Sequence, residues 1–307
     1  MSLGRPNNIA RSIVPTSMTA ALVLVAALSA QLAPTHALSY GENRMQKIDL
    51  WLAQTDEPAP LVLFIHGGGF RGGSYKQVSA QQVQFFLNKG ISFASIEYRL
   101  TDQGPYPMQM NDCARAVQYL RANAGKYNID KKRVASYGGS AGACISMWLA
   151  FHDDMADPKS TDPVARESTR LIAAGSQNGQ PTLDPHTFKE WFGVKSLVMH
   201  PAIPLLFNVA NADGLEKPEA RKLITDASPI THLTKDDAPV YLQYGGADTP
   251  VTETTDANTW VHHARLGIKL KEQMDKIGIE CHVQYRGGPA VTKYAGVPEF
   301  LAAKLKG

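Results

Sequence analysis

The chain alternates short apolar runs with longer segments in which apolar residues recur at helical spacing. The apolar runs predict strands at residues 61–65, 91–98, 133–137, 171–176, 239–244 and 282–285. Helical periodicity predicts helices at residues 77–88, 109–124, 141–152, 266–277 and 297–306. Strands that alternate with helices of this length are typical of βαβ units. We therefore expect an α/β fold with a doubly wound, mostly parallel sheet that helices cover on both faces.

Two segments depart from this rhythm. Residues 47–52 (KIDLWL) alternate polar and apolar side chains and predict an exposed antiparallel strand. Residues 182–221 contain Trp191, Phe192, Phe207 and several prolines. They predict a small cap inserted over the carboxyl edge of the sheet, where open α/β sheets bind ligands. The three aromatic residues fit either an acyl or aromatic pocket or the core of the cap.

The first 37 residues have the pattern of an export signal. Arg5 and Arg11 are the only charged residues before Glu42, and an apolar run follows at residues 20–30. A charged start, a short apolar run and a small-residue cleavage site define such signals. We expect cleavage after Ala37, a mature domain over residues 38–307, and export to the periplasm or the medium without integral membrane association. The alternative is an uncleaved signal that anchors the chain in a membrane.

Composition narrows the classes of function. Apolar residues make up 44% of the 307 residues, and the formal charge balance is only +3. The apolar share excludes a disordered chain, and a small charge without runs of Lys or Arg gives no electrostatic footprint for nucleic acid. Cys113, Cys144 and Cys281 allow at most one disulfide. The nine histidines lack the spacing of a zinc site, so no metal or other cofactor is predicted. The sequence does not indicate an oligomeric state.

The segment Gly138-Gly139-Ser140-Ala141-Gly142 lies between a predicted strand and a predicted helix. In this context G-x-S-x-G is the nucleophile elbow, a tight turn that exposes the serine hydroxyl. Close glycines are needed because the serine takes a strained backbone conformation. The hydroxyl then lies at a helix N-terminus, where free N–H groups favour a developing negative charge. The alternative is a glycine-rich turn with an incidental serine.

The segment His66-Gly67-Gly68-Gly69-Phe70 directly follows the buried strand at residues 61–65. Consecutive glycines let backbone N–H groups approach a ligand oxygen closely. With the N–H of Ala141 they would form an oxyanion hole. A phosphate cradle is the rival interpretation, but the run lacks the Lys-Ser/Thr pair of a P-loop. A tight strand-to-loop turn is the structural alternative, and His66 is expected to brace the loop.

The segment Tyr244-Gly245-Gly246-Ala247-Asp248 follows the strand at residues 239–244. A carboxylate at the end of a late strand fits the chain order Ser, Asp, His, in which the acid orients an imidazole. Alone, an Asp in such a loop is more often a turn former. Glu253 and Asp256 are weaker candidates for the same role.

In this order and at these spacings, the three motifs resemble those of the α/β-hydrolase fold. The chain is similar to carboxylesterases related to hormone-sensitive lipase and to the feruloyl/acetyl-xylan esterase-like (BD-FAE-type) group. The stretches SIEYRL at 95–100 and SPITHLTKDDAPVYLQYGGAD at 228–248 extend the resemblance over roughly residues 40–305. It implies Ser140 as nucleophile and Asp248 as triad acid. It also implies that the N–H groups of Gly68, Gly69 and Ala141 are the oxyanion donors.

The catalytic histidine departs from the pattern of these families. They usually carry it in the loop after the last strand, which here reads YRGGPAV at 285–291 and contains no histidine. His262 and His263 instead follow the Asp248 loop, and a triad is defined by geometry and roles rather than sequence position. We expect His262 to be the base, with His263 as the alternative and His282 too far away. A third possibility is that both are solvated or cap a helix and that the base is absent.

These features together predict an exported serine hydrolase that cleaves carboxylic esters through an acyl-enzyme. The resemblance suggests short acyl groups, such as acetyl or feruloyl, on a small molecule or a polysaccharide. A peptidase or amidase would use the same groups. A catalytically degenerate α/β-hydrolase that acts as a binding protein is the alternative from another class, because the usual histidine is missing.

Overall fold

The structure is a computed structural model that describes Met1, Ser2, Gly4 and residues 32–307. The chain divides into two units, Met1–Ala30 and Gln31–Gly307. The apolar run of the expected signal lies outside the described residues, and the rest of this description concerns the second unit. Among the residues that the structure describes, no helix is long and apolar enough to cross a membrane.

Residues 32–307 are built on one sheet of eight strands in the order β1-β2-β4-β3-β5-β6-β7-β8. The strands are β1 His36–Ser39, β2 Lys47–Trp51, β3 Ala59–Ile65, β4 Ser92–Ile96, β5 Ile129–Gly139, β6 Ala174–Gln177, β7 Val240–Gln243 and β8 Cys281–Gln284. The first two pairs, β1 with β2 and β2 with β4, are antiparallel. All other neighbours are parallel, so their carboxyl ends meet at one edge.

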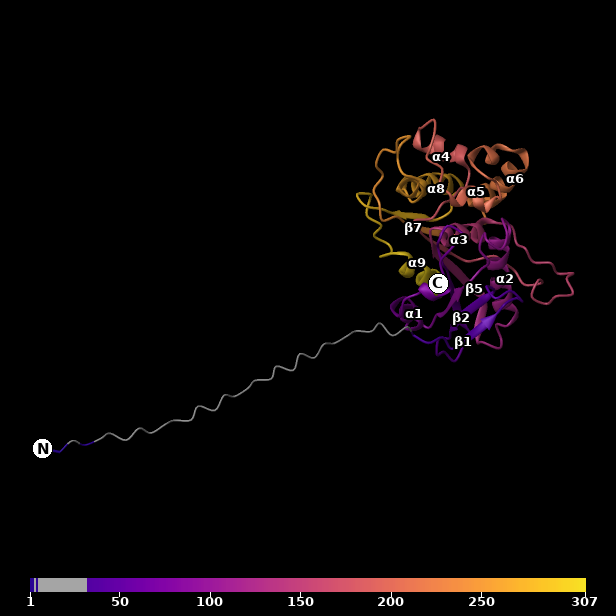
Figure 1. The fold of residues 1–307 in the computed structure, drawn as a ribbon. Coiled ribbons are helices and arrows are strands. Elements are labelled where there is room, and N and C mark those ends of the chain that lie inside the picture. Colours follow the sequence, from indigo (N-terminus) through magenta and orange to yellow (C-terminus); the bar gives the residue numbers. More distant parts are fainter. Residues whose placement is uncertain (3, 5–31) are drawn as a thin grey trace. The chain divides into compact units, whose positions relative to one another are not determined.

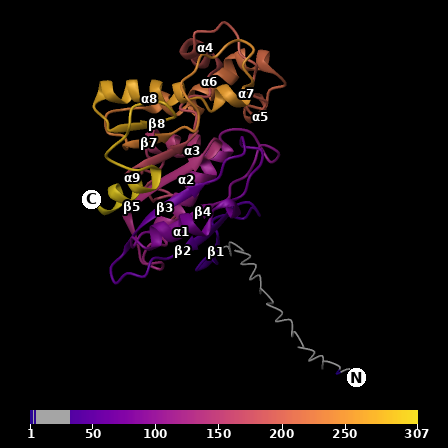
Figure 2. The ribbon, with the colours of Figure 1, turned by 90° about the vertical axis from the view of Figure 1, so that its left-hand side faces the viewer.

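Helices cover both faces of the sheet, as Figures 1 and 2 show. They are α1 Ala80–Leu87, α2 Met108–Ala122, α3 Ala141–Phe151, α8 Ala264–Ile277 and α9 Val297–Lys306, with short 3-10 turns η1 Tyr75–Gln77 and η3 Pro229–His232. Alternation along β3 separates two cores. Leu61 and Leu63 belong to the core with α2, α3 and α8, whereas Val62 and Phe64 belong to the core with α1 and α9. Each fully buried side chain of this size contributes roughly 1.5–3 kcal/mol to stability.

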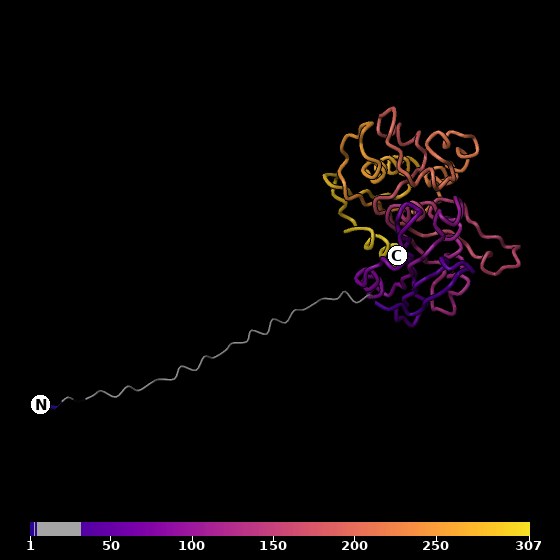
Figure 3. The backbone as a smooth tube through the Cα atoms, viewed as in Figure 1, coloured from indigo at the N-terminus to yellow at the C-terminus, as the bar shows by residue number. Residues whose placement is uncertain are grey.

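The connection between β6 and β7 carries four helical segments before η3, in the region where the sequence predicts a cap. They are α4 Pro185–Phe192, α5 Ala202–Leu206, η2 Ala212–Glu216 and α6 Pro218–Ala227. Figures 1 and 2 show α4, α5 and α6 grouped at one end of the unit, next to α8, which α4 contacts. A second exposed connection follows α3, and its loop extends away from the neighbouring helices in Figure 3.

The expected elements are present, with two differences at the amino-terminal side. The first helix begins at Ala80 rather than residue 77, because Ser79 and Gln82 form a capping box. The expected exposure of residues 47–52 was wrong: Ile48 and Leu50 face one core, Trp51 faces the other, and Asp49 is buried as well. The expected cleavage point after Ala37 lies inside β1. The three cysteines are buried free thiols.

Candidate functional site

Ser140 lies in a strained turn between β5 and α3. Its φ of 50° and ψ of −117° fall where a side chain is rarely found, so neighbouring glycines must make room. A Cβ on Gly138 would come within 2.4 Å of the Ile65 carbonyl oxygen, and one on Gly142 within 2.0 Å. The Ser140 N–H donates to the carbonyl of Gln177 at 2.9 Å, which ties the turn to β6. Alanine 141 then opens α3, so its N–H has no acceptor within the helix.

The glycine loop after β3 packs directly against this turn. A Cβ on Gly67 would lie 2.6 Å from the Gly139 carbonyl oxygen, so only a glycine fits there. Gly68 and Gly69 adopt positive φ angles of 111° and 60°. His66 is fully buried, and its Nε2 lies 2.6 Å from Glu97 Oε1 while its Nδ1 lies 2.7 Å from the Gly67 carbonyl oxygen. The imidazole therefore braces the loop, as the sequence predicts, and is not exposed to a substrate.

The side chain of His262 contacts the hydroxyl group of Ser140. His262 Nε2 lies 2.8 Å from Ser140 Oγ, and its Nδ1–H donates to the carbonyl of Asn258 at 2.9 Å. The second contact fixes the tautomer, because a carbonyl accepts only, and leaves Nε2 with a lone pair for the serine proton. Burial lowers the pKa of His262 below its usual 6.5, and the Asn258 carbonyl opposes that shift. The imidazole is therefore neutral at pH 7 and able to accept a proton.

His262 directly follows a short helix, α7 Ala257–Val261, that the cap holds in place. Trp260 is buried, and its Nε1–H donates to the carbonyl of Val198 at 2.9 Å. The buried side chain of Gln180 donates to the carbonyl of Val261 at 2.7 Å. These contacts fix the backbone on the amino-terminal side of the histidine. Sequence reasoning missed Asn258 and Gln180, because a backbone carbonyl and a lone glutamine leave no motif.

Asp248 does not contact His262 in this structure. Its Oδ1 accepts from Arg265 Nε at 2.7 Å and lies 3.8 Å from His263 Nδ1, and these are its ion pairs among residues 32–307. His263 is buried and caps α8, since its Nδ1 accepts from the Arg265 N–H at 3.1 Å. Burial lowers the pKa of His263. Asp248 and His263 therefore form one cluster at the start of α8, separate from the Ser140–His262 contact.

An open cleft of about 780 Å³ contains Ser140 and His262. Gly68 lines this cleft. Gly69 faces α5 instead, because a Cβ added to Gly69 would lie 3.2 Å from the Cβ of Ala202. The remaining wall consists of Gly67, Gly73, Gly139, Gly245 and Gly246 together with the polar residues Gln77, Gln177, Asn178, Asn258 and Thr259. These side chains offer amide and hydroxyl groups but no carboxylate or thiolate that would hold a metal ion.

The other residues singled out in the sequence lie outside this cleft. Phe192 packs against Trp260 and His263, and Phe207 packs against Tyr106. Trp191 packs on the buried core. His282 lies on β8, the edge strand, with its Nε2 2.9 Å from Glu280. The aromatic side chains of the segment 182–221 therefore belong to packed core.

Comparison with known proteins identifies the family. The family model BD-FAE matches residues 48–258, more than half of the chain. The chain belongs to the BD-FAE family. It is 26% identical over 221 residues to the probable carboxylic ester hydrolase LipM of Mycobacterium tuberculosis, covering 70% of this chain and 48% of that protein. It is 25% identical to the carboxylesterase NlhH of the same species, covering 69% and 68%. The BD-FAE chain thus spans about half to two thirds of the length of these relatives.

Solved structures confirm the α/β-hydrolase fold of this BD-FAE chain. One is an acetyl ester-xyloside bifunctional hydrolase from Caldicellulosiruptor lactoaceticus, with a TM-score of 0.64 and 18% identity over 83% of this chain and 86% of that one. Another is a thermophilic esterase of Thermogutta terrifontis, with a TM-score of 0.61 and 18% identity over 81% and 80%. At this level of identity the likeness concerns the fold alone.

Proposed function

We propose that this protein hydrolyses carboxylic esters with Ser140 as nucleophile and His262 as general base. The observation that carries the proposal is the 2.8 Å contact between Ser140 Oγ and His262 Nε2. This distance is within the range expected for a nucleophile and its base. The carboxylesterases among the relatives support the same chemistry.

The mechanism follows from the contacts of these two residues. His262 Nε2 takes the hydroxyl proton as Ser140 Oγ attacks the ester carbonyl carbon, and the carbonyl oxygen becomes an oxyanion. The N–H groups of Gly68, Gly69 and Ala141 are our candidates to hold that charge. The imidazolium then protonates the departing alcohol, which leaves an acyl-enzyme. Water, activated by the same imidazole, releases the acid and restores the serine.

Asn258 has the orienting role that a carboxylate has in most serine hydrolases. Its carbonyl accepts the Nδ1–H bond and keeps Nε2 aimed at the serine. A neutral carbonyl stabilises the imidazolium less than a carboxylate does, because its oxygen carries only a partial negative charge and forms no ion pair. In this proposal Asp248 is a structural residue that pairs with Arg265 at the start of α8.

The cleft favours esters with a polar alcohol or sugar component. Side chains of Gln77, Gln177 and Asn178 line its wall near Ser140 and offer hydrogen-bond donors and acceptors. No Phe, Tyr or Trp side chain is among the described residues that line the cleft, since the aromatic residues of the segment 182–221 are packed elsewhere. We infer a small acyl group such as acetyl, rather than the bulky aromatic feruloyl group, on a hydroxyl-rich small molecule or polysaccharide.

We also propose that the chain is exported and that its signal ends before Leu32. The Leu32 carbonyl accepts from Trp51 Nε1 at 2.9 Å, and Thr35 Oγ1 accepts from the Leu52 N–H at 3.0 Å. Removal of residues up to Ala37 would break these bonds and shorten β1. The amino-terminal sequence of the secreted protein would test this boundary.

The test of the hydrolase proposal is hydrolysis of p-nitrophenyl acetate by the wild type, Ser140→Ala and His262→Ala. We expect each variant to lose kcat by about 10³-fold or more. The matched control is His263→Asn, in which the amide replaces one helix-capping acceptor with another, so activity should persist. An inactive wild type would favour the binding-protein alternative. Hydrolysis of the corresponding amide, p-nitroacetanilide, at a rate comparable to that of the ester would favour an amidase.

A further inference from the structure

A second group of chemically versatile side chains lies at the far end of α3 from Ser140. Within residues 32–307, His152, Asp226 and His232 each offer one ligand atom, and these atoms lie within 4.8 Å of one another. His152 ends α3, Asp226 is in the last turn of α6, and His232 ends η3. The two imidazole rings are 4.6 Å apart between centroids. Two imidazole nitrogens and one carboxylate oxygen are a common donor set for Zn²⁺.

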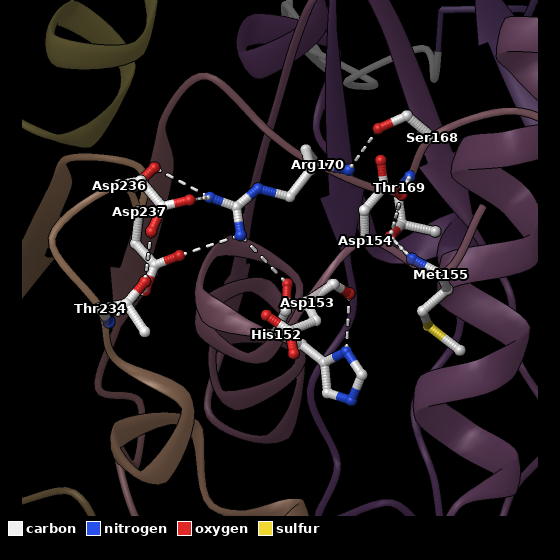
Figure 4. A network of polar contacts seen from close by, with 10 residues as sticks. All are labelled: His152, Asp153, Asp154, Met155, Ser168, Thr169, Arg170, Thr234, Asp236 and Asp237. Atoms are coloured by element: carbon white, nitrogen blue, oxygen red, sulfur yellow. Dashed lines mark hydrogen bonds and ion pairs between the residues drawn. The ribbon is translucent and has the colours of Figure 1, made fainter.

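Two of the three potential ligands, Asp226 and His152, are oriented by a neighbour that leaves one donor atom available. Tyr106 Oη donates to Asp226 Oδ2 at 2.5 Å, and Asp226 Oδ1 lies 4.0 Å from His232 Nε2. The His152 Nδ1–H donates to the carbonyl of Asp153 at 2.8 Å, drawn as a dashed line in Figure 4. That bond leaves the lone pair on His152 Nε2. Metal-bound histidines and carboxylates in proteins have outer contacts of this kind.

The backbone that carries the cluster is held by an arginine-centred network (Figure 4). Arg170 donates to the carbonyl of His152 at 3.4 Å and to that of Asp236 at 2.8 Å. It also forms an ion pair of 3.0 Å with the carboxylate of Asp237, whose side chain is fully buried. The rings of Trp148 and His152 contact each other at a tilt of 35°, with centroids 4.0 Å apart. The end of α3 and the turn after η3 are therefore joined without the help of an ion.

We propose that His152, Asp226 and His232 form a binding site for Zn²⁺, separate from the Ser140 cleft, with water as the fourth ligand. Two imidazoles favour a borderline cation over Mg²⁺ or Ca²⁺, which prefer oxygen ligands. His232 Nε2 now lies 2.7 Å from the Asp226 carbonyl oxygen, so on binding its ring proton moves to Nδ1 and Nε2 turns to the metal. The ion would link α6 and η3 to α3, the helix that follows Ser140.

The test uses the full chain without an affinity tag, stripped of metal by a chelator and titrated with ZnCl₂ by calorimetry. The wild type should bind one ion per chain, and zinc should raise its melting temperature because the ion binds the folded form. Asp226→Asn and His152→Gln should lose both effects. Tyr106→Phe should weaken binding about 10- to 100-fold, because it removes the contact that orients the carboxylate.

His186→Gln is the matched control, because His186 forms an exposed pair with Glu216 but belongs to no such cluster. Its titration should equal that of the wild type. Absence of stoichiometric binding to the wild type, or binding that Asp226→Asn retains, would overturn the proposal. Asp226→Asn keeps the size of the side chain, so it carries the test if His152→Gln fails to fold. Ester hydrolysis should be insensitive to the chelator, which separates this outcome from that of the catalytic proposal.

Discussion

The substitution Asp248→Asn separates the two possible supports of the imidazole that we propose as the base. In a serine hydrolase whose carboxylate holds the histidine, the corresponding change to an amide lowers kcat by about 10⁴-fold. Here the Asn258 carbonyl holds His262 Nδ1 at 2.9 Å, and Asp248 Oδ1 is instead 2.7 Å from Arg265 Nε. The amide of the variant still accepts from Arg265. We therefore expect kcat to stay within about tenfold of the wild type, or roughly 1.4 kcal/mol of barrier.

The remaining loss comes from electrostatics rather than from a broken hydrogen bond. The variant leaves the charge of Arg265 uncompensated, which disfavours the imidazolium that forms on His262. The side chains of Asp248 and Arg265 are 24% and 34% exposed, so water screens most of this effect. Their ion pair is worth about 0.2–1 kcal/mol. The free energy of unfolding should fall by no more than about 1 kcal/mol.

The assay compares kcat for p-nitrophenyl acetate and urea unfolding of the wild type, Asp248→Asn and Asp256→Asn. Asp256 caps α7 through the Thr259 N–H, and Asn caps helices as well as Asp does. This control therefore removes the same charge close to His262 without removing the cap. A loss of about 10³-fold or more in Asp248→Asn alone would refute our reasoning. It would show that Asp248 leaves Arg265 and contacts the imidazole during turnover.

Three further predictions concern the pH profile and the support of the site. Because burial lowers the pKa of His262, kcat/KM should fall on the acid side with a midpoint below 6.5, and a midpoint above that value would indicate a carboxylate on the imidazole. Glu97→Ala should lower the free energy of unfolding by about 3 kcal/mol, measured in urea, since it leaves buried His66 without its 2.6 Å partner. Gly67→Ala should lower kcat by about 10²-fold or more while secondary structure by circular dichroism is kept, because its Cβ would lie 2.6 Å from the Gly139 oxygen and displace the glycine loop.

The fold was predictable where the hydrophobic pattern fits only one type of strand or helix. Residues 61–65 form a continuous apolar run and became the parallel strand β3, buried on both faces. Residues 47–52 show why the same reasoning failed at the edge. Their alternation predicts one exposed face, but Trp51 on that face packs against Phe93 in the core with α1 and α9, and Asp49 is buried as well. Local periodicity cannot show what packs on a face of the sheet.

The candidate site likewise has parts that the sequence predicts and parts that it does not. Glycines with special backbone requirements identify the turn at Ser140 and the loop at Gly68, since their Cβ-free positions are dictated by local geometry. The sequence favours His262 as the base but keeps its neighbour His263 as the alternative, because sequence order does not say which imidazole points at the serine. The partner of its Nδ1 is a backbone carbonyl, which every residue carries. That contact could not be predicted from the identity of residue 258.

The position of the histidine has a physical explanation in the cap. The loop after β8, residues 285–296, has no histidine, and the base that we propose comes from another segment at the same edge of the sheet. α7 has only five residues and would not hold its shape alone. Trp260 and Gln180 bind it to the cap and to the end of β6. Without those two anchors the His262 imidazole would sample many positions, and its 2.8 Å contact with Ser140 would be lost. The segment between β6 and β7 therefore supports the proposed base as well as covering the sheet.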